Sequence, residues 1–234
     1  MSRLVILDRD GVINQDSDAY IKSPEEWLPI PGSLEAIARL CRAEYKVVVI
    51  TNQSGIARGL FDMQTLCAIH DKMLRLLNEK GGKLDAILFC PHGPDDGCSC
   101  RKPLPGMFEE LEQRGGCSLK GVPAVGDSLR DLQAAAAVGA LPVLVKTGKG
   151  RESMKRLSSD PDMAVVGTVP VYMDLGAFVD ELLEGGLDDE IHALAAGSEL
   201  LGTSSPDVSP ADIGARRSSL NILSLSRVAK QYPG

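Results

Sequence analysis

Short apolar runs recur along the chain and alternate with segments of helical spacing. The first run, Leu4 to Leu7, ends abruptly in charged residues. Because each run is only four or five residues long and contains β-branched side chains, it predicts a strand buried on both faces. The expected strands lie at residues 4–7, 46–50, 86–89, 122–125 and 141–145, with residues 163–166 as the candidate for a sixth.

Helical patterns fill the intervals between these runs. Ser33 and Asp62 are expected to cap two helices whose apolar residues recur three and four positions apart. Gly81 closes the second of these helices, and Pro105 suits the first turn of the next. Strands that alternate with helices predict an α/β fold, a doubly wound parallel sheet of the Rossmann-like kind. No insertion is long enough to form a large cap domain.

The pattern changes after residue 184. Residues 185–234 contain a glycine pair, an acidic patch and clusters of Ser, Pro and Arg, without a sustained period. We therefore expect one domain at residues 1–184 and a flexible C-terminal tail at residues 185–234. The sequence indicates no role for this tail.

Charge and hydropathy exclude several classes of partner. The 234 residues include 25 Lys and Arg against 32 Asp and Glu, which gives a formal net charge of −7. Such an acidic chain has no global basic field to recruit nucleic acid or an anionic membrane. No apolar run approaches the ~20 residues of a membrane span, and no secretory signal precedes Asp8. We expect a cytoplasmic monomer that binds a small molecule.

Two aspartates, Asp8 and Asp10, follow the first strand at its carboxyl end, and Gly11 comes next. In open α/β sheets, chemistry takes place beyond the carboxyl ends of the strands. Two carboxylates this close repel each other unless a cation or hydrogen-bond donors offset their charge. The motif alone fits equally a Mg²⁺ site with one carboxylate free for other work and a simple polar turn.

Three further strand ends favour the first interpretation. Thr51 ends the second strand, Asp127 follows the fourth, and Arg101 and Lys102 lie in the loop after the third. Phosphoryl transfer to a carboxylate requires a set of this kind. Mg²⁺ and a lysine neutralise the charge repulsion, a second acid handles the proton, and a hydroxyl with backbone amides holds the phosphoryl oxygens.

The sequence resembles the haloacid dehalogenase superfamily of phosphatases. The resemblance implies that Asp8 is a nucleophile that forms an aspartyl-phosphate and that Asp10 is the general acid/base. It also implies that Thr51 and Lys102 stabilise the phosphoryl group. The matching motifs, in order, are Asp8-Arg9-Asp10-Gly11, Thr51-Asn52, Lys102, and Gly126-Asp127-Ser128 with Asp131.

The same resemblance implies a set of Mg²⁺ ligands. They are the carboxylates of Asp8 and Asp127 and the backbone carbonyl of Asp10. Asp131 lies one turn into the following helix. We expect it to support the site structurally rather than to bind the ion.

Three cysteines and one histidine crowd into eleven residues directly before Arg101 and Lys102. A Cys₃His set is typical of structural Zn²⁺, and four protein ligands leave no position open for a substrate. The metal is therefore expected to clamp the loop and fix the two cations over the phosphate. The expected ligands are Cys90, His92, Cys98 and Cys100; the other cysteines, Cys41, Cys67 and Cys117, are expected to be small buried side chains.

A narrower resemblance, over residues 3–184, is to the D-glycero-D-manno-heptose 1,7-bisphosphate 7-phosphatase family. It rests on residues 51–59 and 100–107. It implies a sugar bisphosphate substrate in ADP- or GDP-heptose biosynthesis, for lipopolysaccharide core or a related product. Arg101 is the best candidate to hold the second phosphate, with Lys146 weaker. The implied substrate contacts are Asp8, Arg9, Asp10, Asp16, Ser17, Asp18, Ala19, Thr51, Asn52, Gln53, Ser54, Arg101 and Lys102.

Two alternatives stay open. Histidinol-phosphate phosphatases share the zinc loop and the Cys-Arg-Lys-Pro motif, but usually carry an acidic residue where this chain has Ser54. A zinc-containing binding module without catalysis is the alternative of another class, and the presence of Asp10 argues against it. His70, a lone histidine in a predicted helix, is expected to be packed or solvated rather than functional.

Overall fold

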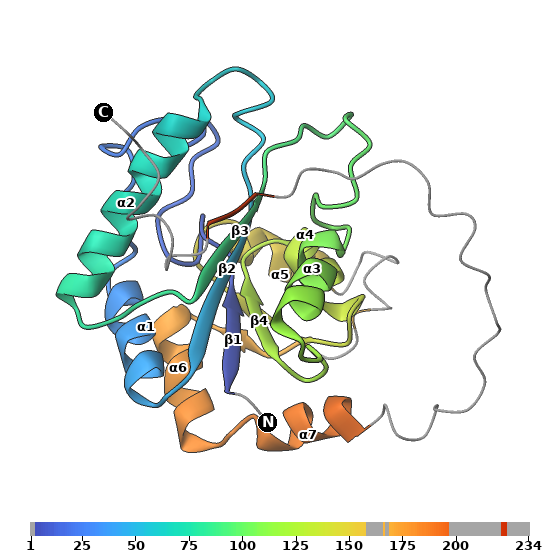
Figure 1. Ribbon diagram of the computed structural model, residues 1–234. Coiled ribbons are helices and arrows are strands. Elements are labelled where there is room, and N and C mark those ends of the chain that lie inside the picture. Colours follow the sequence, from blue (N-terminus) through green and yellow to red (C-terminus); the bar gives the residue numbers. More distant parts are fainter. Residues whose placement is uncertain (1–2, 158–165, 167–168, 197–220, 224–234) are drawn as a thin grey trace.

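A seven-stranded sheet forms the centre of the protein, with helices on both of its faces (Figure 1). The computed structural model describes residues 3–157, 166, 169–196 and 221–223, the last for the backbone alone. The strands are β1 (Leu4–Leu7), β2 (Lys46–Asn52), β3 (Ala86–Cys90), β4 (Pro123–Gly126), β5 (Leu141–Val145), β6 (Val171–Tyr172) and β7 (Asn221–Leu223).

Successive side chains of β1 point to opposite faces of the sheet and are buried on both. Val5 and Leu7 join a core with α1 (Ser33–Arg42), α2 (Met63–Glu79) and α6 (Leu175–Glu184). Leu4 and Ile6 join a second core with α3 (Gly106–Gly115) and α4 (Leu129–Ala136). The helix α5 (Gly150–Leu157) packs near β5 on that second side (Figure 1). This double burial explains why the strands are continuous apolar runs.

The strand order is β6-β5-β4-β1-β2-β3-β7. The chain moves outward from β1 through β2 to β3, then returns to the other side of β1 for β4, β5 and β6. These six strands are parallel, and the predicted doubly wound α/β fold is confirmed. The order reverses at β1, so its carboxyl end opens into the crevice where such sheets bind their ligands.

Two predictions of element ends have opposite outcomes. Asp62 caps α2 as expected, because its carboxylate accepts a hydrogen bond from the Thr65 amide at 2.8 Å. The prediction that Ser33 caps α1 is wrong. Gly32 occupies the cap position with φ of 85°, and the Ser33 hydroxyl donates to the Ile13 carbonyl at 2.6 Å. The hydroxyl therefore ties α1 to the loop that follows Asp10.

The sixth strand is displaced from its expected position. Residues 163–165 of the candidate lie outside the described residues, and β6 is formed by Val171–Tyr172. The isolated cysteines also differ from expectation, because Cys41, Cys67 and Cys117 are half-buried. Within the described residues, no helix is long and apolar enough to cross a membrane.

The segment after residue 184 contains two elements that the sequence pattern did not indicate. The helix α7 (Asp188–Ala196) lies beneath the amino ends of the strands (Figure 1), and β7 pairs antiparallel with β3. Three acidic residues in the first turn suit the positive end of the α7 dipole. The preceding Leu187 belongs to the main core. Residues 197–220 and 224–234 of the expected tail lie outside the described residues, and the boundary at residue 184 stays a prediction.

Replacing Leu187 by alanine tests where the folded domain ends. Leu187 is only 2% exposed, so we expect Leu187→Ala to lower the free energy of unfolding by about 2–4 kcal/mol in urea titrations. Leu194 in α7 is 38% exposed and supplies the control, since Leu194→Ala should change stability by less than about 0.5 kcal/mol. Equally small effects of the two substitutions would contradict this account.

Candidate active site

A cavity of about 290 Å³ opens at the carboxyl ends of the central strands. Its walls come from the strand ends, from the loop at residues 16–21 and from the loop that carries the cysteine cluster. Fourteen of the residues singled out from the sequence line it together: Asp8, Asp10, Asp16, Ser17, Asp18, Thr51, Asn52, Gln53, Ser54, Arg101, Lys102, Asp127, Ser128 and Asp131.

Lys102 is the buried cation at the floor of this cavity. Its Nζ contacts Asp8 Oδ1 at 3.0 Å and Asp131 Oδ1 at 2.6 Å, and it donates to the Ile50 carbonyl at 2.8 Å. An ammonium has three donors, so all of them are used. Burial lowers the pKa of Lys102, but the two carboxylates outweigh that effect and raise the pKa above its usual value. The lysine therefore stays charged.

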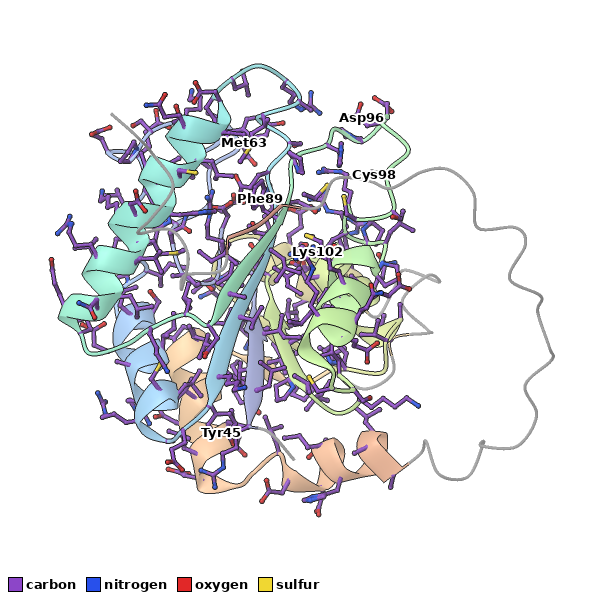
Figure 2. All side chains as sticks on the ribbon, viewed as in Figure 1. Tyr45, Met63, Phe89, Asp96, Cys98 and Lys102 are labelled. Carbon is purple, nitrogen blue, oxygen red and sulfur yellow. The ribbon has the colours of Figure 1, made fainter. Side chains whose placement is uncertain are left out.

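Asn52 fixes the backbone that carries this lysine. Its side-chain amide donates to the Lys102 carbonyl and accepts from the Lys102 amide, both at 3.1 Å. Since Asn52 ends β2, this reciprocal pair joins the loop after β3 to the sheet. Figure 2 shows Lys102 between the cysteine loop and the helices on that side.

Asp131 supports the site from the first turn of α4. Its Oδ2 accepts from the Ser128 amide at 3.0 Å and from the Ser128 hydroxyl at 2.7 Å, which completes a capping box. Its other oxygen contacts Lys102. Burial raises the pKa of Asp131, but the Lys102 ammonium outweighs burial and holds the pKa below its usual value. Both carboxylate oxygens of Asp131 are thus bound to donors of the protein, and its supporting role stays a prediction.

Asp8 and Asp127 are carboxyl groups whose charged form the buried site disfavours. Burial raises the pKa of Asp8 to about 7, with Asp131 and Asp10 adding to the effect and Lys102 opposing it. Burial, Asp131 and Asp8 raise the pKa of Asp127 to about 8. The three carboxylates of Asp8, Asp127 and Asp131 offer oxygen atoms within 4.8 Å of one another. Such an oxygen set with surplus charge fits a hard divalent cation.

Glycines make room for Asp127. A Cβ atom on Gly11 would lie 2.0 Å from Asp127 Oδ2, and one on Gly148 would lie 2.1 Å from the same oxygen. Both glycines have positive φ, which other residues adopt rarely. Glycine is therefore required at position 11 because the Asp127 carboxylate approaches the backbone there, and not only because the chain turns.

Asp10 is held by donors on both of its oxygens. Oδ1 accepts from Arg9 Nε at 3.1 Å and from Asn14 Nδ2 at 2.8 Å. Oδ2 accepts from Arg9 Nη2 and from Gln53 Nε2, each at 3.0 Å. Gln53 Nε2 also donates to Thr51 Oγ1 at 3.0 Å, so the acid and the hydroxyl of the site belong to one network.

Two of the implied substrate contacts do not line the cavity. The Arg9 side chain is fully buried beneath it and directs its guanidinium to Asp10 and Gln53. Ala19 is exposed outside it. Arg9 also meets His70, whose Nε2 lies 3.3 Å from Arg9 Nη1. Burial and the Arg9 charge lower the pKa of His70 well below its usual value, so the ring is neutral. Sequence reasoning had no signal for this contact, because the two residues are 61 positions apart.

The cavity also contains cations that sequence reasoning did not assign to it. Lys149, rather than Lys146, lines the wall, and its Nζ contacts Asp16 and Asp18 at 3.2 Å each. Arg58 and Arg130 lie there too. The only sequence signal that could have placed Lys149 in the cavity was its position in the glycine-containing segment after the fifth strand. The further lining residues not expected are Tyr20, Ile21 and Pro94.

The predicted zinc ligands come together in the loop after β3. His92 Nδ1 lies 3.2 Å from the Cys100 sulfur, and the Cys90 sulfur lies 3.7 Å from that of Cys98 and 3.3 Å from that of Cys100. Sulfurs ~2.3 Å from a tetrahedral zinc are themselves ~3.8 Å apart. The four side chains, which offer atoms within 4.8 Å of one another, therefore fit this ion. Figure 2 labels Asp96 at the outer end of the loop and Cys98 farther in, nearer to Lys102.

Comparisons with known proteins agree with this geometry. A family model described as polynucleotide kinase 3 phosphatase matches residues 4–123, and one described as HAD-hydrolase-like matches residues 99–170. A crystal structure from Bordetella bronchiseptica of D,D-heptose 1,7-bisphosphate phosphatase, complexed with magnesium and phosphate, is 58% identical with a TM-score of 0.73. It covers 78% of this chain and 98% of its own. The fold and the site thus define a phosphomonoester hydrolase of the haloacid dehalogenase superfamily.

The curated relatives narrow the class further. The D-glycero-β-D-manno-heptose-1,7-bisphosphate 7-phosphatase of Bordetella bronchiseptica is 58% identical over 78% of this chain and 98% of its own length. The protein of that name from Pseudomonas putida is 53% identical over 77% and 99%. The chain belongs to the D-glycero-β-D-manno-heptose-1,7-bisphosphate 7-phosphatase family.

Removing Asp131 tests how much the site depends on its support. Asp131→Ala leaves the buried Lys102 with one carboxylate and α4 without its capping box. We expect the free energy of unfolding, measured in urea with EDTA present, to fall by about 3–5 kcal/mol. Glu35→Ala removes an exposed partner of Lys80 and should change stability by less than about 1 kcal/mol. A loss for Asp131→Ala no larger than for this control would contradict the account.

Proposed function

We propose that this protein removes the 7-phosphate of D-glycero-D-manno-heptose 1,7-bisphosphate through an aspartyl-phosphate on Asp8, in ADP- or GDP-heptose biosynthesis. The observation that carries the proposal is the pairing of two features in one cavity. A buried carboxylate and lysine lie at its floor, and the guanidinium groups of Arg58, Arg101 and Arg130 line its walls. A substrate with a phosphate at each end uses both. The names of the close relatives support the same substrate.

In the first step, a carboxylate oxygen of Asp8 attacks the phosphorus of the 7-phosphate. The bond between phosphorus and the sugar oxygen breaks, and Asp10 donates a proton to that oxygen. The charge that builds on the phosphoryl group is held by Lys102 and by the Thr51 hydroxyl. The products are the free 7-hydroxyl of the sugar and an acyl phosphate on Asp8, the aspartyl-phosphate.

In the second step, Asp10 accepts a proton from a water molecule as that water attacks the phosphorus. The bond between phosphorus and the Asp8 oxygen breaks, which releases inorganic phosphate and restores both aspartates. One residue can act first as acid and then as base because the two steps transfer the proton in opposite directions.

Mg²⁺ would be held by the carboxylates of Asp8 and Asp127 and the backbone carbonyl of Asp10. The ion supplies positive charge that offsets repulsion between the nucleophile and the phosphate. The closeness of the Asp8 and Asp127 carboxylates supports this assignment, because their oxygens lie within 4.8 Å of each other and two carboxylates this close repel each other unless a cation offsets their charge.

Zn²⁺ would be held by the cysteine cluster and act structurally. Cys100 precedes Arg101 directly, and the Arg101 guanidinium donates to the His92 carbonyl at 3.3 Å within the same loop. A metal that fixes Cys100 therefore fixes the direction in which Arg101 and Lys102 leave the loop. We further propose that the protein acts as a cytoplasmic monomer on this small substrate.

Substrate comparison tests the proposal. We expect kcat/KM for the heptose bisphosphate to exceed that for histidinol phosphate, the rival substrate, which carries an amine in place of the second phosphate. Arg101→Ala should reduce kcat/KM for the bisphosphate roughly 30-fold. This corresponds to a loss of about 2 kcal/mol of transition-state stabilisation, because a charge-assisted contact is lost. Arg75→Ala, on the exposed side of α2, is the matched control and should leave kcat/KM unchanged. Asp8→Asn should abolish turnover.

Equal or better turnover of histidinol phosphate by the intact protein would overturn the substrate assignment. In that case Asp16 and Asp18, which line the cavity, become the candidates to bind the amine. Near wild-type turnover by Asp8→Asn would instead overturn the covalent mechanism for any substrate.

Metal analysis of cysteine variants tests the zinc assignment. Wild-type protein should contain about one zinc per chain, and Cys98→Ala should lose it because only three ligands remain. Since Arg101 and Lys102 are then less constrained, kcat should fall while Mg²⁺ still restores activity after EDTA. Cys117→Ala, outside the cluster, should keep both zinc and activity. A zinc-free wild-type protein with full activity would contradict the assignment.

A further inference from the structure

His70 is a buried titratable group close to the site, and the mechanism above does not use it. It lies in α2, and its side chain is buried against Arg9 and Phe89. The ring of Phe89 meets it edge to face, with centroids 6.3 Å apart and planes at 67°. This packing fixes the plane of the imidazole, and Figure 2 shows Phe89 between the sheet and α2. The ring presents its Nε2 edge to Arg9.

The chemistry of the two groups defines the direction of their hydrogen bond. A guanidinium has only donors, so Arg9 Nη1 donates and His70 Nε2 accepts, over 3.3 Å. The imidazole must then be neutral, with its proton on Nδ1. That Nδ1 has no partner among the described residues. The tautomer is thus selected by Arg9 alone, although it leaves a buried donor without an acceptor.

Arg9 in turn donates hydrogen bonds to Asp10 from its other two guanidinium nitrogens. Nε donates to Asp10 Oδ1 at 3.1 Å, and Nη2 donates to Oδ1 and to Oδ2 at 3.0 Å each. Nη2 also donates to Gln53 Oε1 at 3.1 Å. The guanidinium plane is therefore held at both ends, by His70 on the far side and by Asp10 and Gln53 on the near side. A planar fork held in this way fixes the rotation of the carboxylate it binds.

We propose that His70 is a positioning residue for Asp10 and acts through Arg9. The proposal rests on the proposed role of Asp10 as the acid and base of the reaction. The acceptor that the described residues offer to Arg9 Nη1 is His70, so its loss frees the guanidinium to rotate toward another partner. Asp10 then loses part of the fork that aligns it, while Asp8, Lys102 and the cavity wall keep their contacts.

Kinetics of the Mg²⁺- and Zn²⁺-loaded enzyme test this role. His70→Leu should lower kcat by about ten- to a hundredfold, as expected for a misaligned catalytic group, with KM changed by less than about twofold. His70→Gln should recover most of the activity, since a glutamine oxygen can occupy the position of Nε2. His70→Asn, equally polar but too short, should resemble His70→Leu. Ile69→Val, a core change in the same helix, should leave kcat unchanged.

A double-mutant cycle separates positioning from general stability. On an Asp10→Asn background, His70→Leu should cause no further loss of kcat beyond about twofold, because there is no acid left to align. The same fold-loss on both backgrounds would overturn the proposal, and so would wild-type kcat in both His70→Leu and His70→Asn. The cycle is measured with p-nitrophenyl phosphate as well as the heptose bisphosphate. An incorrect sugar assignment then affects only the second substrate.

A crystal structure of His70→Leu gives a readout that does not depend on turnover. The Asp10 carboxylate should be rotated or divided between two conformers, with the Arg9 contacts to it lengthened or lost. An Asp10 carboxylate with unchanged position and contacts would overturn the proposal, even if activity had fallen.

Discussion

The site depends on one buried ammonium shared between carboxylates. Lys102 contacts Asp8 and Asp131, and Asp127 lies close enough to form an oxygen cluster with both. Taking these charges out of water is costly, and one cation cannot balance three carboxylates. Burial raises the pKa values of Asp8 and Asp127 and the neighbouring carboxylates raise them further, whereas the ammonium holds the pKa of Asp131, its nearest partner, below the usual value. A divalent cation removes the surplus, so the same arrangement that strains the free protein prepares it for Mg²⁺.

The ammonium reaches this position from a loop that has little core of its own. Lys102 follows the cysteine cluster, and its backbone is tied to Asn52, 50 positions earlier in the chain. Gly106 allows the loop to pack on the start of α3, because a Cβ atom there would lie 2.5 Å from the Ser99 carbonyl oxygen. The loop is thus anchored to β2 on one side and α3 on the other. The cysteine cluster lies in the same loop, directly before Arg101 and Lys102, and its four side chains offer atoms within 4.8 Å of one another.

The sequence predicted which residues lie at the strand ends, because the end of a strand can be recognised from neighbouring residues in the sequence. Apolar runs buried on both faces gave the sheet, and the polar residues after each run had to meet at one edge. The direction in which a side chain points could not be predicted in this way, because it depends on contacts with residues far away in the sequence. Arg9 stands between Asp8 and Asp10 in the sequence and was expected to contact substrate, yet its side chain is turned inward to His70, a contact set by the packing of α2. Lys149 was missed for the same reason, since only the folded loop brings it to Asp16 and Asp18.

The two ends of the cavity therefore differ in the burial of their side chains and in the number of contacts that hold each side chain in place. The phosphoryl end consists of buried groups with several fixed partners. The far wall contains the pair of Lys149 with Asp16 and Asp18, whose side chains are 45% exposed for the lysine and 94% for Asp18. An ion pair this exposed is worth less than about 1 kcal/mol and exchanges readily. A second phosphate that took Lys149 from these aspartates would gain little net energy, because it replaces one partner by another. Discrimination between substrates must then come mainly from the arginines of the wall, whose charge these two aspartates do not already neutralise.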